Sequence, residues 1–300
     1  GLKEISNPAA IGNTGSIYTK DDSGDTELFY MDNSGNALQI SKDGALNDGL
    51  FSPKAFGAKG DYNPTTSIGT DDTAALQAWL NSGHNLFLDE GVYLFTDTLF
   101  VPAGVTILAT GKRRSILWAD LPSDGYGLQL GTLLTYPFGS HITLKDFAIL
   151  GGTSCGLAAL YWHHLWRANI DIYINGDWDY MGLDEYLSAA GEEAAYPGIM
   201  TSHIQIEHSH NDPYFWFSPT YPPSPKRGFY TNSWINANKI WIEISKTTVG
   251  DGLHFIGMSG GMTSNIQGVI QSCAGKAIVI EGGSYPAWGL SISNMHCESN

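Results

Sequence analysis

The chain has 300 residues, and 15 Lys and Arg against 30 Asp and Glu give it a formal net charge of −15. So few basic residues exclude a protein that holds nucleic acid over a broad surface, because phosphate binding needs clustered Lys and Arg. Only 15% of the residues are charged, whereas 36 are glycine and 12% are aromatic. This balance disfavours both a helical bundle and a disordered chain, and it favours a β-rich protein with many turns.

Two further classes of protein are disfavoured. No segment reaches the ~18 consecutive apolar residues that span a bilayer, so membrane insertion is not expected. Three cysteines leave at least one unpaired, which favours synthesis in a reducing cytosol over a disulfide-stapled secreted scaffold.

Residues 1–50 have the pattern of a small β module. Strand-like runs at 17–20, 28–31 and 37–40 are separated by Asp, Asn and Gly turn residues at 21–25 and 32–36. So little apolar surface needs a partner, which association of identical copies would supply. The module resembles the β-hairpin segments near the start of many bacteriophage tail proteins. That resemblance implies attachment to the virion or alignment of three chains.

A helix and two strands are predicted next. Within 69–80, an apolar stripe follows an acidic start at which Thr70 or Asp71 can cap the helix. The stripe consists of Ala75, Leu76, Trp79 and Leu80. Strand-like runs follow at 85–88 and 91–95. This order resembles the beginning of the pectate-lyase-like right-handed β-helix superfamily, in which an amphipathic helix caps the open end of the solenoid. The resemblance implies an all-β, right-handed parallel β-helix over residues 51–300; since the superfamily includes lyases, hydrolases and inactive binders, it does not fix the chemistry.

Irregular repeats support this fold. The segment 146–149 resembles 169–172, which begins 23 residues later, and 265–270 resembles the segment that begins at Asn294, 29 residues later. Periods in the twenties with short alternating strands are typical of stacked coils. The sequence stops just after a strand with no closing cap, so we expect a longer native chain.

A long interruption of the repeats runs from residue 176 to residue 227 and is rich in aromatic residues. Within it we expect a short helix at 184–195 and one strand at 202–208. Long loops that a solenoid does not need are often functional. Acidic and aromatic side chains adjoin here, which makes a second group of candidate ligand contacts: Trp178, Asp212, Tyr214 and Trp216.

Strand alternation predicts two columns of outward side chains. When the strands that begin at Asn169, His203 and Lys239 are aligned, their isoleucines point inward. One outer column then holds Asp171, Gln205 and Trp241. The other holds Tyr173, Glu207 and Glu243.

The carboxylates of Glu207 and Glu243 form the candidate catalytic pair. Stacked strands lie about 4.8 Å apart, so these side chains would be neighbours. Two close carboxylates repel each other, and the pKa of one can rise until it becomes a general acid. Such pairs cleave glycosidic bonds with retention or inversion, according to their separation. Asp171, Tyr173 and Trp241 would bind the sugar. The alternative to a catalytic pair is a solvated sheet face that carries the two Glu residues by chance.

Neither a metal nor a cofactor is expected. The histidines at 203, 208 and 210, with Asp212, do not match a structural zinc spacing. The Ca²⁺-binding carboxylates and nearby Arg base that a pectate-lyase mechanism needs are not recognisable. The basic run 112–114 could neutralise an acidic sugar, but such runs are more often solvated turns.

The two resemblances together imply a bacteriophage tailspike or tail-fibre subunit that forms a homotrimer. Such a protein, made in the host cytoplasm, would sit in the virion tail and contact other tail proteins through residues 1–50. It would bind host capsule or lipopolysaccharide and cleave it by glycosidic hydrolysis. The alternatives are a non-enzymatic receptor-binding or structural tail protein and a polysaccharide lyase.

Overall fold

The computed structural model describes most of the chain. The described residues are 16–22, 25–31, 37–39, 41–42, 45–46, 50–83, 85–131, 139–153, 155–162, 164–184, 198–200, 202–208, 224–231, 234–236, 238–256, 265–281 and 291–298.

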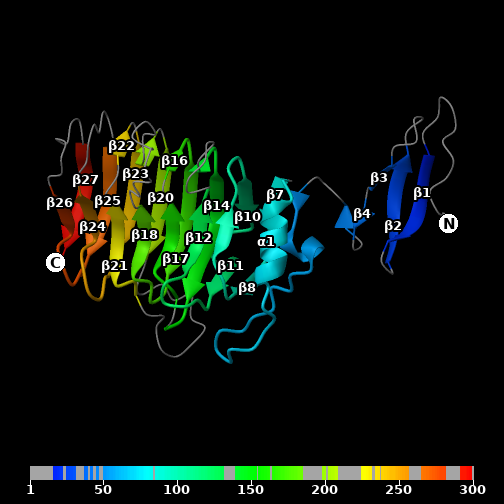
Figure 1. Cartoon of the computed structure of the whole chain (residues 1–300), viewed down its shortest axis with the longest axis horizontal. Coiled ribbons are helices and arrows are strands. Elements are labelled where there is room, and N and C mark those ends of the chain that lie inside the picture. Colours follow the sequence, from blue (N-terminus) through cyan, green and yellow to red (C-terminus); the bar gives the residue numbers. More distant parts are fainter. Residues whose placement is uncertain are drawn as a thin grey trace, which may run out of the picture.

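The first strands form a separate antiparallel sheet. Strands β1 (Ser16–Asp22), β2 (Asp25–Met31) and β3 (Ala37–Gln39) pair in that order, and β4 (Ser41–Lys42) pairs with β5 (Ala45–Leu46). The rings of Tyr18 and Phe29 stack with centroids 5.5 Å apart, and Tyr18 is buried. Figure 1 shows this sheet apart from the remaining strands. The three strands expected before residue 41 are confirmed.

The remaining strands form three parallel sheets. The long sheet contains, in spatial order, β6 (Leu50–Phe51), β7 (Asn85–Leu88), β10 (Thr106–Ala109), β14 (Thr143–Gly151), β17 (Asn169–Asn175), β20 (His203–His208), β23 (Lys239–Ile244), β25 (Asn265–Gln271) and β27 (Ser291–Glu298), with β8 (Gly91–Phe95) and β11 (Ser115–Ala119) attached through β14. The seven-stranded sheet contains β9 (Leu99–Val101), β12 (Tyr126–Leu130), β15 (Ala158–Trp162), β18 (Tyr180–Asp184), β21 (Arg227–Thr231), β24 (Leu253–Ile256) and β26 (Ile278–Glu281). The third sheet contains β13 (Gly139–Ser140), β16 (His164–Trp166), β19 (Gly198–Met200) and β22 (Trp234–Asn236).

This topology is that of a parallel β-helix. From β13 to β24, successive strands visit the three sheets in turn, and each strand from β13 to β21 pairs with the one three elements later. The coils therefore stack along one axis from α1 to β27 (Figure 1). The predicted fold class is confirmed.

The inward side chains form ladders along this axis. Ile170, Ile204, Ile240 and Ile266 are in register on four neighbouring strands, and all four are buried. Each buried aliphatic side chain contributes about 1.5–3 kcal/mol by leaving water. This repeated gain explains why these four inward positions are all isoleucine.

The helix α1 (Thr73–Asn81) covers the N-terminal end of the coils. Leu76, Trp79 and Leu80 are buried, as the apolar stripe predicts. The N-cap residue is Asp72, whose side chain makes no cap hydrogen bond, rather than Thr70 or Asp71. Asp71 does accept a hydrogen bond from the amide of Thr73, the first helical residue, at 3.0 Å, whereas the Thr70 amide donates to Asp61. Within the part of the chain that the structure describes, no helix has both the length and the apolar character to cross a membrane.

Two β-bulges correct the predicted repeat alignment. Asn169 pairs with Thr143 rather than Asp146, and Asn265 pairs with Ser291 rather than Asn294. Both alignments were therefore wrong by three residues. Asp146 (φ 65°) and Asn294 (φ 51°) adopt left-handed backbone conformations where the register shifts. They are bulge residues within strands, not the first residues of strands.

The interruption at 176–227 contains more regular structure than expected. The strand at 202–208 is confirmed as β20, but β18 and β19 were not predicted. Asp184, the predicted start of a helix, ends β18, and residues 185–195 lie outside the described residues.

Candidate active site on the long sheet

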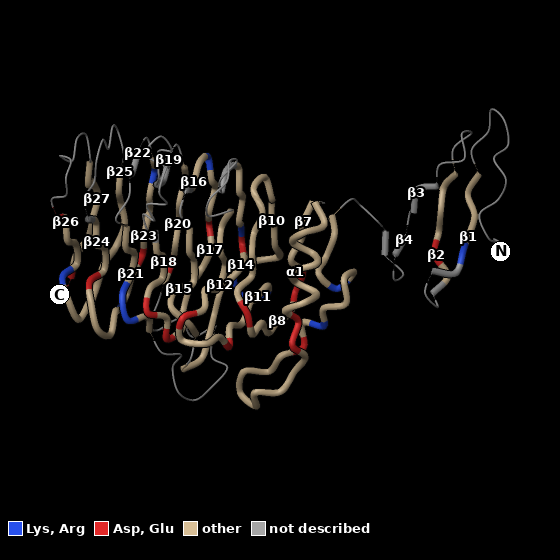
Figure 2. Tube along the Cα trace, in the orientation of Figure 1, with Lys and Arg blue, Asp and Glu red and all other residues tan. Residues whose placement is uncertain are grey.

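The two predicted columns exist on the outer face of the long sheet. Asp171 pairs with Gln205 and Gln205 with Trp241, while Tyr173 pairs with Glu207 and Glu207 with Glu243. Figure 2 shows the acidic positions that these neighbouring strands carry. The predicted register of β17, β20 and β23 is therefore confirmed.

Lys112 brings two of the carboxylates together. It lies in the turn between β10 and β11, and its Nζ is 2.5 Å from Asp171 Oδ1 and 2.9 Å from Glu207 Oε1. The three side chains are only 19%, 28% and 30% exposed. Burial opposes the charge of Lys112, but the hydrogen bonds to the two carboxylates outweigh it and raise the pKa of Lys112. Gln205 also donates a hydrogen bond to Glu207 Oε1 at 3.0 Å. The Glu207 side chain is thus bound by both a cation and an amide.

Glu243 has a different environment from Glu207. Burial is the main cause that raises the pKa of Glu243, the negative charge of Glu207 raises it further, and Lys112 opposes the rise. Neighbouring carboxyl groups with such different surroundings separate into an acid and a base. Of the pair, Glu243 is therefore the carboxyl group whose surroundings favour the protonated form.

Two predicted sugar contacts are wrong because the side chains are buried. Tyr173 points outward but is only 4% exposed. It packs in an outer apolar cluster with Ile116, Trp118, Ala148 and Leu150. Trp178 is 0% exposed within the main core, and its Nε1 donates to the Asn175 carbonyl at 3.3 Å. Neither ring offers an open face to a ligand.

The remaining predicted contacts divide into two groups. Asp171 and the half-buried Trp241 lie on the face that carries the glutamate pair. Asp212, Tyr214 and Trp216 lie outside the described residues. Among the residues that the structure describes, no group of three or more His, Cys, Asp or Glu is arranged to hold a metal ion.

Lys112 is the site residue that sequence reasoning assigned to a solvated turn. It is 59 residues from Asp171 and 95 from Glu207, so strand alternation carries no information about their contact. The available signal was chemical. Asp171 and Glu207 on adjacent strands attract a cation, and the run 112–114 is the densest group of basic residues in the chain.

Replacing Lys112 with Gln is expected to raise the pKa of Glu243 further. The positive charge of Lys112 lowers that pKa, and the variant removes it. Carbon-detected NMR titration of the Glu side-chain carboxyl groups measures the shift. Lys145→Gln is the matched control, because Lys145 is in register with Asp171 on the same face. An unchanged Glu243 titration in the Lys112 variant would contradict this electrostatic arrangement.

The fold and this face together define a parallel β-helix protein with a carboxylate pair on an outer sheet. No family model matches the chain. The chain is 35% identical over 92 residues to "Depolymerase 1, capsule K3-specific" of Klebsiella phage KP32, a match that covers 29% of the chain and 11% of the relative. It is 37% identical over 107 residues to "Depolymerase 1, capsule K30/K69-specific" of Klebsiella phage K5-2, covering 34% of the chain and 11% of the relative.

A third relative is fungal. The chain is 32% identical over 133 residues to "Probable glucan endo-1,3-beta-glucosidase" of Arthroderma benhamiae, covering 37% of the chain and 14% of the relative. The matches thus span only 11% to 14% of the length of these relatives. The predicted resemblance to phage tailspikes is confirmed by the two phage depolymerases.

Proposed function

We propose that this chain is part of a phage tailspike that binds a host surface polysaccharide, capsule or lipopolysaccharide, and hydrolyses it. Two relatives named as capsule-specific depolymerases and one named as a glucan endoglucosidase support action on a polysaccharide. The observation that carries the proposal is the pairing of Glu207 with Glu243, with Lys112 bound to Glu207.

The proposed reaction uses the two glutamates in different protonation states. Glu243 donates its proton to the glycosidic oxygen as the C–O bond breaks, and the Glu207 carboxylate attacks the anomeric carbon to form a glycosyl ester. Glu243 then removes a proton from water, which hydrolyses the ester. Neighbouring strands about 4.8 Å apart bring the two carboxyl groups near the ~5–5.5 Å that suits retention, so we propose a retaining mechanism.

Other groups on the face would position the sugar. Trp241 is two residues before Glu243, so both side chains leave the same face of β23. Its indole offers a flat apolar surface on which a pyranose ring can pack. Gln205 adds a polar group one strand away from Trp241, and Asp171 adds another two strands away. Lys112 would hold the Glu207 side chain in place.

The test is incubation of the full chain with purified capsule and lipopolysaccharide, beginning with the K3, K30 and K69 capsules named for the relatives. Hydrolysis with retention produces reducing ends, no ultraviolet absorbance of unsaturated uronates, and an initial product with the anomeric configuration of the substrate by proton NMR. Unsaturated uronates would instead establish a lyase. Binding with no new reducing ends would establish an adhesin.

Residues 1–50 are proposed to attach the spike to other tail proteins or to align three chains, which places the protein in the virion tail. The small antiparallel sheet supports this proposal, because Ile17 and Tyr30 on it are 58% and 38% exposed, an apolar surface that another chain can cover. Light scattering of the intact chain is expected to report a trimer. A stable monomer would overturn the trimeric arrangement.

A further inference from the structure

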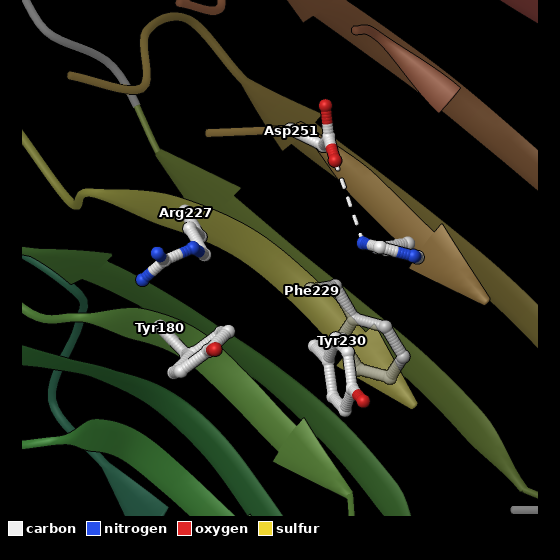
Figure 3. A pocket seen from close by; sticks show the side chains of 6 residues that line it. Tyr180, Arg227, Phe229, Tyr230 and Asp251 are labelled. Atoms are coloured by element: carbon white, nitrogen blue, oxygen red, sulfur yellow. Dashed lines mark ion pairs between the residues drawn. The ribbon is translucent and has the colours of Figure 1, made fainter. Parts of the chain in front are cut away.

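A second cluster of functional side chains lies on the seven-stranded sheet. They surround a pocket of about 240 Å³ lined by Tyr180, Arg227, Phe229, Tyr230, Asp251 and His254. Figure 3 shows Arg227 near Tyr180, and Asp251 across the pocket from them. The carboxylate pair belongs to the long sheet, so this pocket is a separate site.

The strand register places these side chains together. Tyr180 on β18 pairs with Arg227 on β21, and Tyr230 on β21 pairs with His254 on β24. The Tyr180 and Tyr230 rings are 5.6 Å apart, and the Tyr230 and His254 rings are 5.4 Å apart. Three neighbouring coils therefore contribute a continuous aromatic floor.

Arg227 lies over one end of this floor. Its guanidinium carbon is 5.2 Å from the centroid of the Tyr180 ring, which holds the group by a cation–π contact. Within the described residues, no carboxylate pairs with this guanidinium and no acceptor takes its hydrogen bonds. The adjacent Lys226, by contrast, binds Asp179 at 2.6 Å. Arg227 thus retains a rigid fork of N–H donors that matches a planar carboxylate.

The acidic residue of the pocket does not neutralise Arg227. Asp251 accepts a hydrogen bond from the Lys276 amide at 2.7 Å, and its other oxygen is 3.4 Å from His254 Nδ1. His254 Nε2 in turn lies 3.5 Å from Glu281 Oε1. Asp251 and His254 therefore form a polar end that suits sugar hydroxyls, while the Arg227 end lacks an anion.

We propose that this pocket binds a carboxylate-bearing sugar residue, a uronic acid, within a glycan chain. The carboxylate would bind the Arg227 guanidinium in a bidentate manner. The apolar face of the pyranose ring would pack on Tyr180 and Tyr230, and its hydroxyls would reach Asp251 and His254. A phosphate dianion suits the pocket less well, because the Asp251 carboxylate also lines it.

Calorimetric titration of the full chain tests the ligand class. Glu243→Gln is used as the background so that no probe is cleaved. The probes are hexamers of galacturonate and of glucuronate, with their carboxyl-reduced counterparts as matched neutral ligands. At least one acidic hexamer is expected to bind tenfold or more tightly than its reduced counterpart. No binding of either acidic hexamer, or equal affinity for acidic and reduced forms, overturns the proposal.

Variants of Arg227 then locate the binding. Arg227→Gln is expected to weaken binding of the acidic hexamer at least tenfold while leaving the reduced hexamer unaffected. Arg227→Lys keeps the charge but loses the forked pair of donors. Its affinity for the acidic hexamer is therefore expected to lie between those of the parent and of Arg227→Gln. Arg167→Gln is the matched control, because that guanidinium also lies over a ring, 5.1 Å from the centroid of Trp166. Unfolding temperatures verify that each variant is folded, and full acidic-hexamer affinity in a folded Arg227→Gln variant overturns the assignment.

Gly250→Ala provides a test that keeps the charge. A Cβ at Gly250 would lie 2.8 Å from Arg227 Cγ, so the Arg side chain must move. Weaker binding of the acidic hexamer is expected, and unchanged binding counts against a fixed guanidinium. The outcomes separate this proposal from the hydrolysis proposed above. If Glu243→Gln still cleaves polysaccharide, only the hydrolytic assignment fails, whereas if Arg227→Gln binds normally, only the pocket assignment fails.

Discussion

Glu243→Gln is expected to slow polysaccharide hydrolysis by about 10²–10⁴-fold, the contribution usual for a positioned general acid. The amide has nearly the shape of the carboxyl group but holds no proton that it can transfer. Initial rates of reducing-end formation measure the effect. Burial and the charge of Glu207 raise the pKa of Glu243, so parent activity is also expected to fall as pH rises through that raised value.

Two further variants make this result specific. Glu207→Gln removes the proposed nucleophile and is expected to lose activity to a similar extent. Glu90→Gln is the control, because Glu90 is 71% exposed and its ion pair with Arg114 is long, at 4.0 Å. It is expected to retain parent activity. Cleavage at the parent rate by both Glu207→Gln and Glu243→Gln would disprove the assignment of the pair.

The same carboxyl group makes stability depend on pH. The pKa of Glu243 is higher in the folded protein than in the unfolded chain, so the folded state binds more protons between the two values. The free energy of unfolding therefore falls as pH rises through this window, which begins near the ordinary Glu value of 4.5. Urea denaturation across this window is expected to show the fall in the parent. Glu243→Gln is expected to lack that contribution.

Gly268→Ala is expected to lower the free energy of unfolding by about 4 kcal/mol or more, which is exceptional for one methyl group. Gly268 lies on β25 opposite the bulge of β27, with φ +143°. An added Cβ would lie 1.9 Å from the Ile242 carbonyl oxygen. Backbone of the neighbouring strand occupies that position and cannot rotate aside as a side chain can. The ladder between β23 and β25 must therefore distort.

Gly111→Ala separates the steric cost from the conformational cost. Gly111 has φ +144°, almost the value at Gly268, but no atom of another part of the chain lies within 4 Å of the place that an added Cβ would take. Its substitution is expected to cost only the backbone strain, about 1–3 kcal/mol. Urea denaturation of both variants measures the difference. Equal losses of unfolding free energy in Gly111→Ala and Gly268→Ala would show that the contact with Ile242 adds nothing to the cost at Gly268.

The register at the candidate site was predictable because three strands begin alike. Isoleucines follow Asn169, His203 and Lys239 with the same alternation, and this pattern determines which side chains point outward. The same reasoning misaligned Asp146 and Asn294. Asn and Asp tolerate left-handed backbone, so they mark bulges within strands as readily as turns before them.

What covers an outer face was not predictable from alternation. Tyr173 is outward, yet residues of β11 and β14 bury it. Lys112 reaches the face from a turn that precedes β17 by more than fifty residues. Both facts depend on contacts between coils far apart in sequence, which a period-two pattern does not encode. The carboxylate pair could therefore be predicted, but its counter-ion and the extent of its open surface could not.

The two bulges bracket the coils that carry the candidate site. From β17 through β20 and β23 to β25 the register is uninterrupted, so every outward residue has a partner directly above or below it. Distances between groups on this face along the axis are therefore quantised in steps of one strand spacing, about 4.8 Å. Duplication or deletion of one whole coil within this interval would change the separation of two binding groups by one step without turning any side chain to the other face. Under the proposed function, the number of coils in this interval would set the length of the glycan repeat that the face can match.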